Sequence, residues 1–108
     1  MKIPKRFRLM GHIINVVEEK RLAHERNWNG AALYDECLIQ LLPISEQHPR
    51  AESKFEQTFC HELAHWLLYY AGGAVNHNLG GEYVHNNEEF VDLLGSLIHQ
   101  AFDSMEFD

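Results

Sequence analysis

The segment from Glu52 to Tyr70 constrains the fold of this chain more than any other part of the sequence. When the segment is placed on a helix, at about 100° per residue, its apolar side chains cover most of the circumference instead of a single stripe. These side chains are Phe55, Phe59, Leu63, Trp66, Leu67, Leu68 and Tyr70. A helix that is apolar nearly all round has to be buried between other elements. Gly72 and Gly73 follow the segment and predict the end of the helix.

The residues before this helix favour a sheet. Residues 7–17 are rich in β-branched side chains and predict a strand broken near Gly11. Residues 18–26 are charged and fit either a short helix or an extension of that strand. Two short apolar runs between residues 31 and 42 then predict a hairpin that ends at Pro43. Three consecutive strands favour an antiparallel sheet.

A second helix is expected after the long one. Residues 44–53 and 74–86 are polar or glycine-rich and predict connecting loops. Asn87 is a good N-cap for a helix that runs to about Met105. The chain of 108 residues is long enough for one compact domain. We therefore expect a single α+β domain over residues 1–108, in which an antiparallel sheet of about three strands packs on two helices.

Composition excludes several classes of function. Hydrophobic residues make up 45% and charged residues 23% of the chain, which is typical of a globular protein. The net charge is -7 and no long basic run is present, so direct binding of nucleic acid is not expected. No apolar stretch has the length of a signal peptide or a membrane span, so we expect a cytoplasmic protein with no membrane partner. Cys37 and Cys60 are expected to be reduced and buried.

The long helix carries an H-E-x-x-H motif at residues 61–65. Histidines at positions i and i+4 project from one face of a helix and can share a metal ion. Imidazole suits zinc, and a catalytic zinc site takes three protein ligands and leaves a position for water. Glu62 lies at the edge of the same face, where its carboxylate can accept a proton from the water. The motif predicts a Zn²⁺ site with His61 and His65 as ligands and Glu62 as the general base.

The second helix offers a third ligand. Its apolar arc includes Gly95, which allows another backbone to approach closely. Glu88 lies at the edge of this arc, whereas Glu89 projects toward the polar side. Glu88 is therefore the expected ligand and Glu89 a surface carboxylate. Asp92, one turn after Glu88, can accept the free ring N–H of a ligand histidine and orient the ring, and we expect His61 to be its partner.

Attack of a metal-activated water on a carbonyl group also needs a partner that stabilises the developing oxyanion. His77, Tyr83 and His85 are the candidates, because they lie in the loop between the two helices. Structural or surface roles remain the alternative for all three. The other four histidines are interpreted as lying outside the site, although His99 shares a helix face with Glu88; they are His12, His24, His48 and His99.

The pattern HELAH followed by NEEFVD resembles the gluzincin branch of zinc metallopeptidases, whose pattern is HExxH with a downstream N-E-x-x-x-D helix. The likeness covers residues 55–102 and extends to minimal gluzincins and to ImmA/IrrE-like peptidases of phages and mobile elements. It implies a small zincin-like domain with ligands His61, His65 and Glu88 and base Glu62. It also implies a protein or peptide substrate whose extended backbone pairs with a sheet edge. The larger downstream subdomain and the helix-turn-helix that accompany such domains are not visible.

Two alternatives stay open. The chain could be a catalytically silent binding module in which His77 or His85 closes the metal site as a fourth ligand. It could also be a latent peptidase whose acidic tail, residues 103–108, folds back so that Glu106 or Asp108 reaches the metal. The sequence does not determine the oligomeric state.

Overall fold

The computed structural model describes residues 1–26, 28–75 and 84–108, which form a small α+β domain. The described strands are β1 (Arg6–Leu9), β2 (His12–Glu18), β3 (Gly30–Leu33) and β4 (Leu38–Leu41). The helices are α1 (Leu22–Glu25), α2 (Glu52–Val75) and α3 (Glu88–Ser104), with single 3-10 turns η1 (Tyr34–Glu36) and η3 (Val84–Asn86). No described helix has the length and apolar composition that crossing a membrane requires.

The four strands form one mixed sheet in the order β1-β2-β4-β3. β1 and β2 pair antiparallel around Met10 and Gly11, whose φ angles of 50° and 79° suit a tight two-residue hairpin turn. β3 and β4 form the expected antiparallel hairpin. β2 and β4 pair in parallel, so the prediction of a purely antiparallel sheet of about three strands is wrong. The cause is the connection through α1, which carries the chain to the far edge before β4 returns beside β2.

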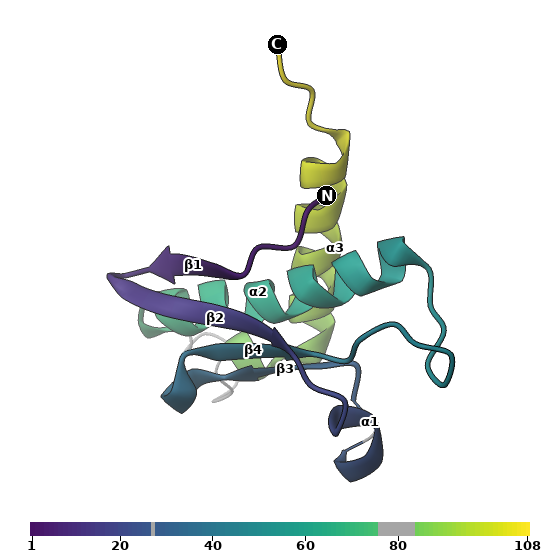
Figure 1. The fold of residues 1–108 in the computed structure, drawn as a ribbon. Helices are drawn as coiled ribbons and strands as arrows, with labels where there is room; N and C mark the ends of the chain where they lie inside the picture. The colour runs from purple at the N-terminus through teal and green to yellow at the C-terminus, as the bar shows by residue number, and fades with distance from the viewer. Residues whose placement is uncertain (27, 76–83) are drawn as a thin grey trace.

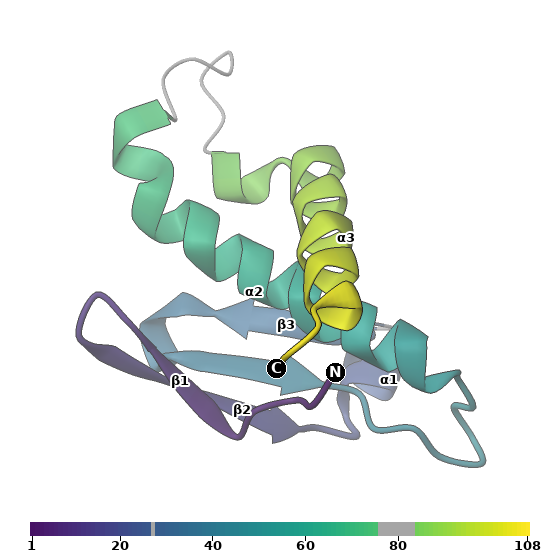
Figure 2. The same ribbon diagram turned by 90° about the horizontal axis from the view of Figure 1, so that it is seen from above.

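The two long helices lie on the same side of the sheet (Figure 1). α2 lies along the sheet, and the main core between them contains Ile14, Ile39, Phe59 and Trp66. α3 packs on the other side of α2 through Val91, Ala64 and Leu68, and Figure 2 shows it crossing that helix. The long helix is therefore enclosed between the sheet and α3, as its apolar circumference predicts.

The two long helices differ in how well the sequence marks their ends. α3 begins after Asn87, whose side-chain oxygen accepts a hydrogen bond from the Phe90 amide, as expected for an N-cap. α2 continues through Gly72 and Gly73 to Val75, so the predicted end of this helix is wrong. Glycine inside a helix costs only about 1 kcal/mol, so Gly72 and Gly73 do not by themselves end α2.

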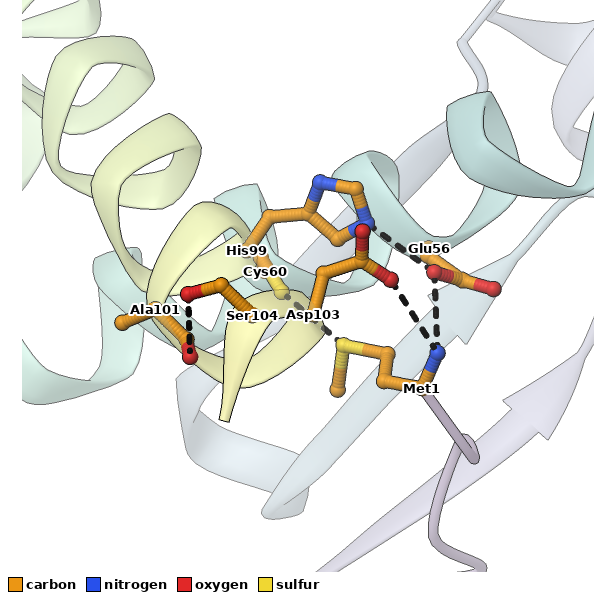
Figure 3. Close-up of polar contacts among 7 residues, drawn as sticks. All are labelled: Met1, Glu56, Cys60, His99, Ala101, Asp103 and Ser104. Atoms are coloured by element: carbon orange, nitrogen blue, oxygen red, sulfur yellow. Dashed lines mark hydrogen bonds and ion pairs between the residues drawn. The ribbon is translucent and has the colours of Figure 1, made fainter. Parts of the chain in front are cut away.

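A polar contact joins α2 and α3 away from the H-E-x-x-H motif (Figure 3). The Nε2 atom of His99 lies 2.9 Å from Glu56 Oε1, and the Met1 amino group lies 3.2 Å from the same oxygen. His99 is only 6% exposed. The hydrogen bond from His99 is the main reason why the pKa of Glu56 lies below its ordinary value. His99 thus joins the two helices, in agreement with its assignment outside the site.

Candidate metal centre

Three side chains from the two long helices converge on one point. His61 Nε2 lies 3.1 Å from Glu88 Oε2, and His65 Nε2 lies 3.1 Å from Glu88 Oε1. One ligand atom from each of these residues lies within 4.8 Å of the other two. The i, i+4 spacing on α2 brings the two imidazole rings together edge to face, with their centroids 5.0 Å apart. These are the three residues that the sequence predicts as metal ligands.

The separation of these atoms fits a zinc ion. Zinc binds imidazole nitrogen and carboxylate oxygen at about 2.0–2.2 Å, so neighbouring ligands of a tetrahedral ion lie about 3.3 Å apart. The measured separations of 3.1 Å are close to this value. Two imidazoles and one carboxylate are also a donor set that catalytic zinc sites use.

Both imidazoles are oriented through their second ring nitrogen. His61 Nδ1 lies 3.3 Å from Asp92 Oδ1, and His65 Nδ1 lies 2.6 Å from the backbone oxygen of His85. An Nδ1–H that donates to such an acceptor leaves Nε2 with a free lone pair for a metal. Burial lowers the pKa of His65, which also favours the neutral ring. The pairing of Asp92 with His61 is the one that the sequence predicts.

Gly95 determines how closely α3 approaches the ligands on α2. A Cβ atom at this position would lie 2.8 Å from His61 Cα and 3.0 Å from His61 N, closer than real Cβ contacts. Because the opposing atoms are backbone, they could not move aside without shifting α2. Glycine at residue 95 therefore lets the helix that carries Glu88 lie directly against the residue that carries the first imidazole.

Glu62 lies beside the ligands and is almost completely buried, with an exposed fraction of 6%. Burial, together with the nearby charge of Glu88, raises the pKa of Glu62 to about 8. Its carboxylate packs against Gly30 at the start of β3, where a Cβ atom would lie 3.1 Å from Glu62 Oε2 and 2.8 Å from Thr58 Cγ2. A buried carboxyl group with a raised pKa is typical of a general acid or base.

The centre opens into a cleft of about 1350 Å³. His61, Glu62, His65 and Glu88 line it together with all of β3, which is an edge strand of the sheet. Tyr34 follows β3 and lines the same cleft. The cleft therefore contains the candidate ligands, the candidate base and a free sheet edge.

Tyr34 belongs to an aromatic wall beside the centre. Its ring stacks on Tyr69 with centroids 4.3 Å apart and meets the ring of His85 edge-on at 5.3 Å. Burial raises the pKa of Tyr34, and the charges of Glu62 and Glu88 raise it further. Its hydroxyl therefore stays protonated and is a hydrogen-bond donor. No sequence pattern marks Tyr34 or Gly30 as part of the site, because only the position of β3 beside α2 brings them to the centre.

Three loop residues were predicted as candidates to stabilise the oxyanion or to complete the metal site. Tyr83 and His77 lie outside the described residues. His85 contributes its backbone oxygen to His65, while its ring packs against Tyr34 and Tyr69. Within the described part of the chain, the convergent group at the centre contains three candidate ligands and does not include His85.

Several other positions discussed from the sequence do not belong to the convergent group. Glu89 is exposed, as expected of a surface carboxylate. His12 stacks on Tyr70, and His24 packs against His48. Residues 105–108 are exposed, and Figure 1 shows them extending away from the sheet and α2 instead of back toward the ligands. Cys37 and Cys60 are unpaired thiols, of which only Cys60 is fully buried.

Comparison of the chain with protein-family models, curated proteins and solved structures gives no match.

Proposed function

We propose that the chain is a zinc metallopeptidase that hydrolyses peptide bonds in a protein or peptide substrate. The observation that carries this proposal is the convergence of His61, His65 and Glu88 beside a buried Glu62. A purely structural metal site has no need of a buried carboxyl group next to its ligands, and it usually has four protein ligands. Three convergent ligands among the described residues agree better with a catalytic site.

His61, His65 and Glu88 would hold the zinc ion. When bound, zinc supplies a Lewis acid that lowers the pKa of a water molecule and polarises the substrate carbonyl. The positive charge of a nearby cation also favours the ionised form of Glu62 and opposes the effect of burial on its pKa. The carboxylate of Glu62 then accepts a proton from the attacking water and later donates it to the leaving amine. Asp92 and the His85 carbonyl keep the two imidazoles in position during these steps.

Tyr34 is the candidate that the geometry supports best for stabilising the oxyanion. It lines the cleft that contains Glu62 and Glu88, and its hydroxyl remains protonated. A donor already aimed into a partly buried site can stabilise developing negative charge without reorganisation. His85 is the weaker candidate for this role. Its backbone oxygen orients His65, and its imidazole ring packs against Tyr34 in the aromatic wall.

The edge strand β3 supports an extended peptide as the substrate. β3 has a sheet partner on one side only, and the cleft runs along it to the candidate base. An extended backbone can add to such an edge through main-chain hydrogen bonds, so that a peptide bond passes the centre. Side-chain specificity would then come from the residues that line the cleft.

A comparison of Glu62→Gln with the unaltered chain tests the proposal. Both proteins are loaded with zinc and incubated with a complex mixture of peptides, and new peptide termini are identified by mass spectrometry. We expect Glu62→Gln to retain zinc and to lose cleavage by about 10²- to 10⁴-fold, the usual contribution of a general base. Glu89→Gln is the matched control, because it removes an exposed carboxylate from α3.

Two outcomes oppose the proposal. Equal cleavage by the unaltered chain and Glu62→Gln would show that Glu62 is not the base. Zinc binding without cleavage of any peptide or protein offered would favour the silent binding module.

A further inference from the structure

The face of α3 that points away from α2 is apolar and exposed. Phe90, Leu93 and Leu97 have exposed fractions of 46%, 59% and 52%. On the helix they lie opposite Val91 and Gly95, which are buried against α2. We call Phe90, Leu93 and Leu97 the outer stripe. Single exposed apolar residues are normal on a protein surface, but a continuous row of large ones is typical of an interaction site.

The spacing of the outer stripe fits a second helix as its partner. The three residues follow each other at intervals of three and four positions, which is the a-d-a pattern of a heptad repeat. The buried residues of α3, including Gly95, lie on the side of the helix opposite the outer stripe. A partner can therefore bind the stripe while α3 remains packed on α2. Residues of this kind insert between the side chains of a neighbouring helix.

The charge around the outer stripe indicates the kind of helix that fits. Glu89 occupies a g position of this heptad register and is exposed. Asp103 occupies a later g position, but its carboxylate lies 3.9 Å from the Met1 amino group. All nine lysines and arginines of the chain precede Phe55, so α3 and residues 105–108 contain acidic residues and no basic ones. A second copy of α3 would bring acidic flanks together, which costs binding energy. A partner helix with basic residues beside its apolar side would instead be attracted to the acidic side chains of α3.

We propose that the outer stripe binds an amphipathic helix of a partner protein, in which lysine and arginine flank the apolar side. The apolar side chains of the partner cover Phe90, Leu93 and Leu97, and its basic residues pair with Glu89. This docking does not depend on the peptidase activity, because the stripe faces away from the helix that carries His61 and His65.

The test uses a fluorescently labelled synthetic helix of about 18 residues, with leucine at a and d positions and lysine at e and g positions. Binding to the full chain is followed by fluorescence anisotropy. We expect the double variant Leu93→Ser, Leu97→Ser to bind at least about tenfold more weakly, as the loss of two apolar anchors predicts. Ile13→Ser with Val17→Ser is the matched control, because these β2 residues are similarly exposed, at 46% and 39%. The control should bind the peptide as the unaltered chain does.

Charge is tested separately. Raising the salt concentration from about 0.1 M to about 0.5 M should weaken binding, because screening reduces the attraction between exposed charges. A peptide with glutamate in place of every lysine should not bind.

Three results would overturn the proposal. The stripe variant could bind the lysine peptide as tightly as the unaltered chain. The glutamate peptide could bind as tightly as the lysine peptide. Sedimentation could show a dimer of the unaltered chain that the stripe variant does not form, in which case a second copy occupies the stripe.

Discussion

The two candidate ligand histidines differ in what orients them. His61 contacts the carboxylate of Asp92, whose side chain is 77% exposed, whereas His65 contacts a backbone oxygen in a more buried position. A backbone acceptor survives substitution of the residue that supplies it, but a side-chain acceptor does not. Asp92 is therefore the orienting contact that mutation can remove cleanly.

We predict that Asp92→Ala weakens zinc binding by about 10- to 100-fold, the usual effect of losing a group that orients a metal ligand. The affinity is measured by competition with a chelating dye. Glu89→Ala removes the same charge from the same helix and should leave the affinity nearly unchanged, because Glu89 does not belong to the convergent group. Equal losses in the two variants would mean that only the overall charge of α3 matters.

Helical periodicity predicted the convergent residues because it fixes which side chains share a face. His61 and His65 are one turn apart on α2, and Glu88 and Asp92 are one turn apart on α3. Tyr34 and Gly30 carry no such signal. Gly30 reaches the centre from β3 and Tyr34 from η1 directly after it, and their contact with α2 depends on the order of strands in the sheet.

At the scale of elements, the approach of α3 to α2 is what brings Glu88 to the two histidines. We predict that Gly95→Ala lowers the free energy of unfolding, because overpacking usually costs about 1–3 kcal/mol and the better helix propensity of alanine returns at most about 1 kcal/mol. Urea denaturation measures the change. Ser96→Ala, the next position on the helix, serves as the control and should cost less.

The same substitution should also weaken zinc binding, since it moves Glu88 away from His61 and His65. A Gly95→Ala protein with unchanged stability and zinc affinity would contradict the close approach of the two helices.

The contact of Glu56 with His99 gives the helix pair a pH dependence (Figure 3). The pKa of Glu56 in the folded protein lies below its ordinary value of 4.5. Its carboxylate therefore stabilises the fold above that pH, and this contribution is lost as the pH falls through the folded-state pKa. We predict that Glu56→Gln lowers the free energy of unfolding at pH 7, and that the difference narrows as the pH falls below 4.5.

Denaturant titrations at several pH values measure this difference. Glu52→Gln, an exposed position in the first turn of the same helix, should show much less dependence on pH. If the free energy of unfolding of Glu56→Gln differed from that of the unaltered chain by the same amount at every pH, the charge of Glu56 would not be what stabilises the fold.

The sequence predicted the elements better than their arrangement. Local patterns identified the hairpin of β3 and β4 and the N-cap of α3, because these signals lie within a few residues. The parallel pairing of β2 with β4 joins segments that are far apart in the chain, and no local pattern encodes it. The predicted end of α2 was wrong because each glycine costs a helix only about 1 kcal/mol, a penalty too small to end α2 before Val75.

For the molecule as a whole, the two halves of the chain supply different parts of one site. The first half contributes the sheet, with β3 and Tyr34 along the cleft. The second half contributes the residues proposed as ligands and base, together with the outer stripe on α3. A metal that binds only the folded arrangement would stabilise the whole domain, because these ligands converge only after both helices have packed.

Metal content of the purified protein, measured by elemental analysis after zinc supplementation and removal of free ions, tests the central proposal most directly. We expect about one zinc ion per chain, as a single three-ligand site requires, with much less in Glu88→Ala and no loss in Glu89→Ala. Absence of zinc from the unaltered chain, or equal retention by both variants, would contradict a metal centre formed by His61, His65 and Glu88.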